Sequence, residues 1–352
     1  MADSATLTRS IGEDVGTTAL PAPYLLFLGD TTEPGYAKTA FGLRDWAPQL
    51  CVGEHVLPGG TVSAGLPVMG FADAIANGAR AMLIGVANRG GTIPDAWIPA
   101  LEQALAAGLD IVSGMHVPLH QKPRLAEAAR RYGRRLVDVR TPPGSIPVAT
   151  GRKRTGRRLL TVGTDCALGK KYTALAIARD LRARGIDATF RATGQTGIMI
   201  AGAGIPIDSV VADFIAGAAE MLSPDAAADH LDVIEGQGSL FHPAYAGVSL
   251  GLLHGSQPDL FVVCHAPGRH EILGHPGQPV PSIEAVIAQT VALGRVTSPA
   301  IRCAGISLNT SGLAAGAADA ALDAVANRLG LPAADPIRGG ARLAALLDAC
   351  AA

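Results

Sequence analysis

The sequence predicts an α/β protein of two domains, each built on a mostly parallel sheet. Its 352 residues suit two domains, because an average domain has roughly 150 residues. Short apolar runs alternate with segments of helical periodicity along most of the chain, a pattern typical of parallel strands joined by crossover helices. A glycine-rich loop at residues 163–171 lies between such a run and a helical segment, so the second domain carries the stronger functional signal.

The first domain is expected to be a doubly wound, Rossmann-like domain over residues 23–150. Residues 1–22 are small and polar and are interpreted as a flexible tail. Helical spacing covers 98–107, where Gly108 ends the helix, and 125–132. Buried strands are expected at 24–28, 81–86, 110–114 and 136–139.

A change in composition separates the domains. Prolines between residues 142 and 147 are followed by the basic run 151–158, and such stretches are typical of domain boundaries. We interpret the basic run as a solvated linker, with a phosphate-binding patch as the alternative. The second domain then spans 151–352. Its strands are expected at 159–162, 188–192, 233–234, 260–264 and 303–308, and its helices at 173–184 and 314–329.

Composition excludes several function classes. Lys plus Arg number 29 and Asp plus Glu number 30, so the balanced charge excludes a strongly basic nucleic-acid-binding protein. No apolar stretch approaches the roughly 18 residues of a membrane helix, and the first twenty residues do not resemble a signal peptide. The five cysteines form no CxxC pair, which favours reduced thiols and no zinc site. We therefore expect a cytoplasmic protein with neither a nucleic-acid nor a membrane partner.

The loop at 163–171 has the context of a phosphate-binding loop. Successive backbone N–H groups in such a loop form an anion-binding nest, and the N-terminus of the following helix adds positive charge. The second domain is therefore predicted to be P-loop NTPase-like. The residues predicted to bind a phosphate-bearing cofactor are Gly163, Thr164, Asp165, Cys166, Gly169, Lys170, Lys171 and Tyr172.

Two departures from the usual P-loop pattern bear on the chemistry. Thr164 occupies the place of the first glycine, and Lys171 replaces the Ser or Thr whose hydroxyl binds Mg²⁺. Nucleotide cleavage uses that metal to neutralise charge, whereas a loop that only holds a diphosphate does not need it. The sequence favours a cofactor bound without hydrolysis and no metal site, with Thr173 as a displaced metal ligand as the alternative. Covalent catalysis by Cys166 is disfavoured, although the nest would lower its pKa, because no histidine lies near it in the sequence.

Other polar side chains follow predicted strands, at the edge where open α/β sheets bind ligands. Glu235 and His242 are candidate proton acceptors, and Arg191 and Arg269 are candidate carboxylate clamps. An ordinary structural role is the alternative for each of them. The further candidates for substrate binding are Gln195, Thr196, Asp213 and Gln237.

Several long blocks together resemble one bacterial family, the DgcN-type D-glutamate N-acetyltransferases, formerly a family of unknown function with a dethiobiotin-synthetase-like P-loop domain. The resemblance covers roughly residues 24–345 and is most specific between 163 and 258. The blocks are GTDCALGKKYTALAIARDLRARG, FRATGQTGIMIAG, VVADFIAGAAE, DVIEGQGSLFHPAYAGVSLGLLHGSQPD and GISLNTS.

The resemblance implies transfer of an acetyl group from acetyl-CoA to the amine of D-glutamate. The loop would hold a CoA phosphate without a metal, His242 or Glu235 would be the base, and the backbone at 236–238 would stabilise the oxyanion. Arg191 and Arg269 would clamp the two carboxylates of the substrate. Two alternatives are an ATP-dependent ligase or kinase related to dethiobiotin synthetase, with ATP and Mg²⁺ as cofactors, and a non-catalytic nucleotide-binding protein. We expect a homo-oligomer.

Overall fold

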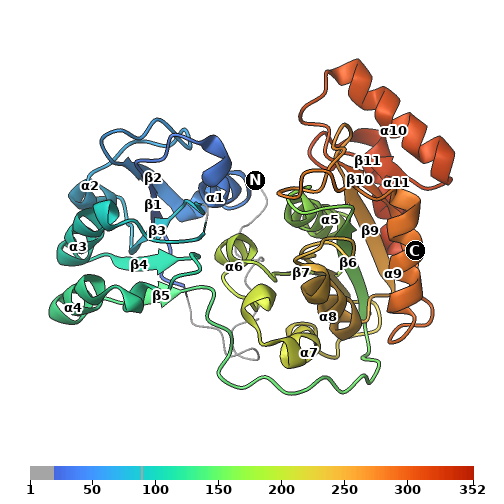
Figure 1. Ribbon diagram of the computed structural model, residues 1–352, viewed down its shortest axis with the longest axis horizontal. Coiled ribbons are helices and arrows are strands. Elements are labelled where there is room, and N and C mark those ends of the chain that lie inside the picture. The colour runs from blue at the N-terminus through green and yellow to red at the C-terminus, as the bar shows by residue number, and fades with distance from the viewer. Residues whose placement is uncertain (1–19, 89) are drawn as a thin grey trace. The chain divides into compact units, whose positions relative to one another are not determined.

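The computed structural model describes residues 20–88 and 90–352, and the chain divides into two compact units (Figure 1). Unit 1 contains the described residues up to Pro142 together with Gln195–Pro206, and unit 2 contains Pro143–Gly194 together with Ile207–Ala352. The expected tail at 1–22 lies almost wholly outside the described residues. The expected boundary at residue 150 falls within unit 2, and the sequence did not predict that a later segment returns to unit 1.

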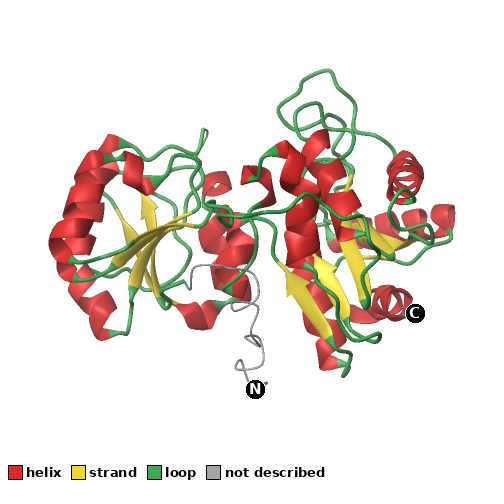
Figure 2. Cartoon of the chain, turned by 90° about the horizontal axis from the view of Figure 1, so that it is seen from below, coloured by secondary structure: helices red, strands yellow, loops and turns green. Residues whose placement is uncertain are grey.

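Unit 1 is built on a five-stranded parallel sheet with the order β2-β1-β3-β4-β5. Each strand runs in the same direction as its neighbours, and Figure 2 shows helices flanking the sheet. The strands are β1 (Tyr24–Gly29), β2 (Cys51–Val56), β3 (Ala81–Ile84), β4 (Asp110–Ser113) and β5 (Leu136–Asp138). The helices are α1 (Lys38–Trp46), α2 (Phe71–Ala76), α3 (Ile98–Ala107), α4 (Pro123–Tyr132) and α6 (Gln195–Ala201).

Strand β2 is the strand of unit 1 that the apolar pattern did not reveal. Its centre carries Glu54, which is fully buried. The carboxylate accepts hydrogen bonds from the Ser63 hydroxyl at 2.5 Å and from the Ala64 backbone N–H at 2.6 Å. A buried carboxylate is tolerated when it is hydrogen-bonded, so this strand is stabilised by polar contacts that hydrophobic periodicity does not report.

Helix α6 belongs to unit 1 although it follows β7 of unit 2 in the chain. The Thr196 hydroxyl lies 3.1 Å from the hydroxyl of Thr39 on α1. A Cβ at Gly114 would lie 2.9 Å from the Cβ of Gln195, so the absence of a side chain lets the two segments approach.

Unit 2 contains a six-stranded parallel sheet with the order β11-β10-β9-β6-β8-β7. Strand β6 lies between β9 and β8, and the chain adds strands first on one side of it and then on the other, which creates a ligand-binding crevice at the carboxyl end of β6. The strands are β6 (Arg157–Gly163), β7 (Ala188–Arg191), β8 (Leu231–Ile234), β9 (Leu260–His265), β10 (Arg302–Leu308) and β11 (Ala333–Ala334). The helices are α5 (Lys170–Ala183), α7 (Ile215–Leu222), α8 (Ala246–Ser256), α9 (Ile283–Gly294), α10 (Ala315–Leu329) and α11 (Gly340–Ala351).

The two parallel sheets confirm the predicted α/β class, and every strand predicted from an apolar run is present. Burial is complete in β1, β3 and β4 and partial in β5 and β7. Within the part of the chain that is described, no helix has both the length and the apolar character that crossing a membrane requires.

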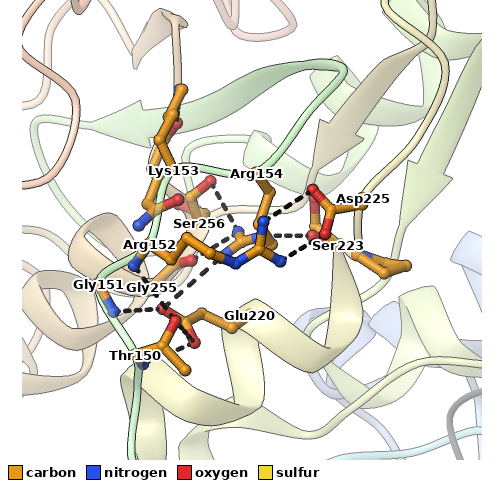
Figure 3. Close-up of polar contacts among 12 residues, drawn as sticks. Thr150, Gly151, Arg152, Lys153, Arg154, Glu220, Ser223, Asp225, Gly255 and Ser256 are labelled. Carbon is orange, nitrogen blue, oxygen red and sulfur yellow. Dashed lines mark hydrogen bonds and ion pairs between the residues drawn. The ribbon is translucent and has the colours of Figure 1, made fainter.

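The basic run is only in part a solvated linker, because two of its arginines are buried in unit 2 (Figure 3). Arg154 is buried and donates from Nε to the Ser223 carbonyl at 2.6 Å and from Nη2 to the Gly255 carbonyl at 2.8 Å. Its Nη1 lies 3.7 Å from a carboxylate oxygen of Glu220. Burial lowers the pKa of Arg154 to about 10, whereas the nearby carboxylates, first that of Glu220, act in the opposite direction and stabilise the charged guanidinium.

Of the neighbouring arginines, Arg158 is buried in the same way and Arg152 forms an exposed ion pair. Arg158 is 1% exposed and donates from Nε to the Ser223 hydroxyl at 2.8 Å, while that hydroxyl donates to Asp232 at 2.6 Å. Arg152 pairs with Asp225 at 2.5 Å. The run therefore joins the start of β6 to the end of α7 and to β8, and it is part of unit 2.

Candidate functional site

The loop between β6 and α5 lies at the carboxyl end of the central strand of unit 2. Thr164 and Asp165 are fully buried. Gly169 directly precedes α5 with a φ of +100°, a left-handed conformation that strains residues with a side chain. The glycine predicted to shape the loop therefore does so at the first turn of the helix, where backbone N–H groups point towards an anion.

Lys170 folds back over this loop. Its Nζ donates to the Asp165 carbonyl at 2.8 Å, and the side chain is 7% exposed. A Cβ at Gly163 would lie 3.3 Å from this Nζ, and one at Gly236 would lie 1.6 Å from the Thr161 carbonyl. Burial lowers the pKa of Lys170 below that of an ordinary lysine, so an anionic ligand would restore the stability of its charged form.

The Asp165 carboxylate of the loop forms hydrogen bonds with the segment that follows β9. One oxygen accepts from Arg269 Nη1 at 3.0 Å and from the Leu273 N–H at 2.9 Å, and the other accepts from the Cys166 N–H at 2.6 Å. Arg269 also donates to the Cys166 carbonyl at 2.8 Å. The structure thus brings Arg269, predicted as a substrate clamp, to the phosphate loop itself.

His242 lies beside Cys166 in space, although the two are far apart in the sequence. A ring nitrogen of His242, the Cys166 sulfur and an Asp165 carboxylate oxygen all lie within 4.8 Å of one another. Burial raises the pKa of the Cys166 thiol, with Lys170 and Arg269 opposing that shift. The expectation that the nest lowers this pKa is therefore wrong, because burial outweighs the nearby positive charges.

Hydrogen bonding fixes the state of the His242 ring. Its Nδ1 accepts from the Ala244 N–H at 3.1 Å, so the neutral ring carries its proton on Nε2. The ring is 2% exposed, stacks on Tyr245 at 4.5 Å between centroids and meets His275 edge-on at 4.9 Å. This tautomer makes Nε2 a hydrogen-bond donor.

Glu235 follows β8 directly and is 5% exposed. One carboxylate oxygen accepts from the Thr193 and Gly194 N–H groups, each at 3.0 Å. Burial raises the pKa of Glu235, while Lys171 and the two N–H groups act in the opposite direction. Gln237 donates to the Thr193 hydroxyl at 2.9 Å, so the turns after β7 and β8 hold each other in place beside the loop.

Arg191 has an internal partner. Its Nε donates to Asp232 at 2.6 Å, and the same carboxylate lies 3.1 Å from His230 Nε2. The pairing engages Nε of Arg191, and the role of Arg191 as a carboxylate clamp stays a prediction. The sequence missed the pairing because Asp232 lies within an apolar strand rather than beside a motif.

The remaining predicted residues are dispersed. Gln195 and Thr196 begin α6 and belong to unit 1, and Asp213 is exposed in a short 3-10 turn. Lys171 Nζ lies 5.2 Å from the centre of the Tyr172 ring in the first turn of α5. Unit 2 by itself therefore brings together the loop, Glu235, Gln237, His242 and Arg269.

The hydroxyl of Thr173 has a hydrogen-bonding partner within unit 2. It lies 2.7 Å from the Ser307 hydroxyl, and both residues are buried between α5 and β10. This contact argues against Thr173 as a displaced Mg²⁺ ligand. The three ligand atoms of Asp165, Cys166 and His242 form the one group with metal-like spacing among residues 20–88 and 90–352, but both Asp165 oxygens already accept N–H groups.

Two family models match this chain. A Rossmann-like domain of unknown function, DUF1611_N, matches residues 51–142, and a P-loop domain of unknown function, DUF1611_C, matches residues 147–345. The chain belongs to the DUF1611 family. A DUF1611 family protein from Anabaena variabilis has a crystal structure that superposes with a TM-score of 0.83 at 33% identity, covering 93% of this chain and 98% of that one. These matches confirm the Rossmann-like and P-loop folds predicted for the two halves.

Two DUF1611 relatives carry a functional name. A protein named D-glutamate N-acetyltransferase from Tritonibacter scottomollicae is 50% identical over 333 residues, which cover 95% of this chain and 99% of the relative. Another of the same name, from a Pseudoalteromonas species, is 46% identical over 318 residues, covering 90% and 96%. The family resemblance read from the loop and strand-end blocks is confirmed.

Proposed function

We propose that this protein is an acyltransferase that moves the acetyl group of acetyl-CoA to the amine of D-glutamate. The observation that carries the proposal is the pair of relatives named D-glutamate N-acetyltransferase, which align over nearly their full length at 46–50% identity. The products would be N-acetyl-D-glutamate and free CoA, a thiol.

The phosphate loop supports CoA as the acetyl carrier. Lys171 stands where a Mg²⁺-binding hydroxyl is usual, and the nearby Thr173 hydroxyl is occupied by Ser307. Lys170 is a buried ammonium at the loop, with a pKa that burial lowers. A diphosphate held by backbone N–H groups and lysine needs no metal and no bond cleavage.

The side chains beside the loop supply the proton transfers. Amide formation requires the substrate ammonium to lose a proton, and a carboxylate becomes a better base as its pKa rises. Glu235 meets this requirement through burial, so we assign it as the base. His242 Nε2–H would donate to the carbonyl oxygen or to the departing thiolate, which fits its tautomer better than proton abstraction does.

The test is thiol release from acetyl-CoA in the presence of D-glutamate, L-glutamate or no amino acid, each with and without EDTA. We expect release that requires D-glutamate and continues in EDTA. Release of ADP from Mg-ATP, with no thiol release under any condition, would contradict the proposal and favour an ATP-dependent ligase or kinase.

A further inference from the structure

Unit 2 contains a cavity that neither the loop nor the proton-transfer residues explain. Its volume is about 380 Å³, at the lower end of the roughly 300–1,000 Å³ of small-molecule sites. It lies between the segment after β9, the start of α9 and the later turns of α10. A cavity of this size suits a nucleoside-sized fragment rather than a whole coenzyme.

One part of the cavity wall is basic. His265, Arg269 and Arg328 line it, and none of the described lining residues is an Asp or Glu. The carboxylates of Asp165 and Glu284, which pair with Arg269 and Arg328, lie outside the lining. The pKa of His265 is lowered, first by burial and then by the positive charges of Arg328 and Arg269, so the three groups share one positive field. An anion placed among them would relieve that repulsion.

The other part of the wall is apolar. It is formed by small and branched side chains from α10 and from the segment that leads into α9, chiefly Ala321, Ala324, Val325, Val280 and Pro281. A planar heteroaromatic ring could pack against such a wall with its hydrophobic faces. The cavity therefore has the two properties that a purine nucleoside phosphate requires.

The cavity and the phosphate loop are joined through shared side chains. His265 Nδ1 lies 2.9 Å from the Thr164 hydroxyl of the loop. Arg269 lines the cavity and also donates to the Asp165 carboxylate and the Cys166 carbonyl. A ligand with two neighbouring anionic groups could therefore place one group at the phosphate loop and the other at the basic wall of the cavity.

We propose that this cavity binds the adenosine 3′-phosphate end of CoA, with Arg328 contacting the 3′-phosphate. This inference rests on the proposed function. In CoA, one ribose carries the 3′-phosphate and, through its 5′ oxygen, the diphosphate that the loop would hold. ADP and ATP lack the 3′-phosphate, so Arg328 would select CoA over ordinary adenine nucleotides.

Arg328 forms an ion pair with Glu284 at the surface of unit 2. Its Nε lies 3.1 Å from a carboxylate oxygen of Glu284 at the start of α9, and the Arg328 side chain is 57% exposed. The guanidinium carries four further N–H donors on its two Nη atoms, a geometry that suits bidentate phosphate recognition. Glu284 thus orients the side chain, while the phosphate contact falls to the Nη groups.

The experiment compares acetyl-CoA with acetyl-3′-dephospho-CoA as donors. We expect the wild-type KM to be about 10–100-fold higher for the dephospho donor, the range expected when a charge-assisted contact is lost. In Arg328→Ala the two KM values should come within about threefold of each other. Arg295→Ala, which removes an exposed arginine at the end of α9, should retain the discrimination.

Equal KM values in the wild type, or full discrimination in Arg328→Ala, would overturn the inference while leaving the acetyl transfer intact. If neither donor releases thiol, the proposed function fails and a binding measurement decides the inference separately. Calorimetry with adenosine 3′,5′-bisphosphate and with ADP should then show tighter binding of the bisphosphate, and only when Arg328 is present. Equal affinities would overturn the cavity assignment.

Discussion

Both ends of the sheet in unit 2 bury charged side chains, but they do so differently. At the amino end, Arg154 and Arg158 are surrounded by carbonyls and hydroxyls of the protein, and Asp232 completes the network. Burial shifts pKa values towards the neutral form at both ends, for Arg154 and Arg158 and for Lys170 and Glu235. Each arginine, however, donates to at least two acceptors of the protein, whereas Lys170 donates to the Asp165 carbonyl. A buried charged side chain with several partners in the protein belongs to the fold. A buried charged side chain with few partners marks a candidate site where a ligand would supply the missing partner.

The largest expected effect comes from a substitution at the carboxyl end of the sheet in unit 2. Glu235→Gln keeps the shape of the side chain and removes the base, so kcat should fall about 10²–10⁴-fold with little change in the unfolding midpoint. In the wild type, kcat/KM should rise with pH along a limb that lies above the ordinary glutamate pKa of about 4.3, because burial raises the pKa of Glu235. Glu127→Gln, at an exposed position of α4 in unit 1, is the matched control, and an unchanged kcat in Glu235→Gln would remove Glu235 from the mechanism.

The next largest effect comes from a substitution at the amino end of the same sheet. Arg154→Met leaves Glu220 and two carbonyls without their buried partner, so the free energy of unfolding should fall by about 3–5 kcal/mol. The kcat of the folded fraction should stay unchanged. Urea titration with Arg152→Met as the comparison separates the buried arginine from the exposed one. A loss of kcat without a loss of stability would mean that the two ends are not functionally distinct.

A smaller effect sharpens the assignment of the loop. Lys170→Met preserves the aliphatic stem and removes the charge, so the KM for acetyl-CoA should rise about 10–100-fold. The KM for D-glutamate should change much less, because the ammonium contacts the loop carbonyl of Asp165 rather than the turns after β7 and β8. Steady-state kinetics with each substrate varied in turn would measure both, and equal increases would contradict a role confined to the coenzyme.

The smallest effect concerns the pH dependence of the internal network. The hydrogen bond to Asp232 is the main cause that raises the pKa of His230, with Asp187 adding to it. The stabilisation is therefore full below the unfolded histidine pKa of about 6.5 and is lost as pH rises through the higher folded value. A tenfold difference in proton affinity between the folded and unfolded chains corresponds to about 1.4 kcal/mol of stability.

Urea unfolding of wild type and His230→Gln at about pH 6 and about pH 9 checks this expectation. The difference in unfolding free energy between the two proteins should shrink at the higher pH. A constant difference would show that His230 contributes through packing alone.

The sequence predicted those elements that produce a pattern among neighbouring residues of the chain. The apolar runs located the strands, and the order of strand, loop and lysine located Lys170 at the carboxyl end of β6. It missed β2, because Glu54 is buried by hydrogen bonds rather than by apolar character. It also missed the proximity of Cys166 and His242 and the pairing of Arg191 with Asp232, because contacts between distant segments leave no pattern along the chain.

The basic run at 151–158 shows that composition can also predict the wrong environment for a residue. A cluster of arginines in a Pro- and Gly-rich stretch has the composition of a linker, yet Arg158 is almost fully buried. What decides its role is the set of acceptors that α7 and β8 present to it, and those are known only after the chain has folded. Arg328, in contrast, gave no sequence signal, since a lone arginine near the end of a helix is common.

The position of α6 has a consequence for how the protein is made. During synthesis, the first 142 residues leave the ribosome without the helix that packs Thr196 against Thr39. At about 5–20 residues per second, several seconds pass before residue 206 is made, and by then β6, α5 and β7 of the other unit have already been synthesised. The two units are therefore completed in an interleaved order, and a chain cut between them would leave unit 1 without one of its helices.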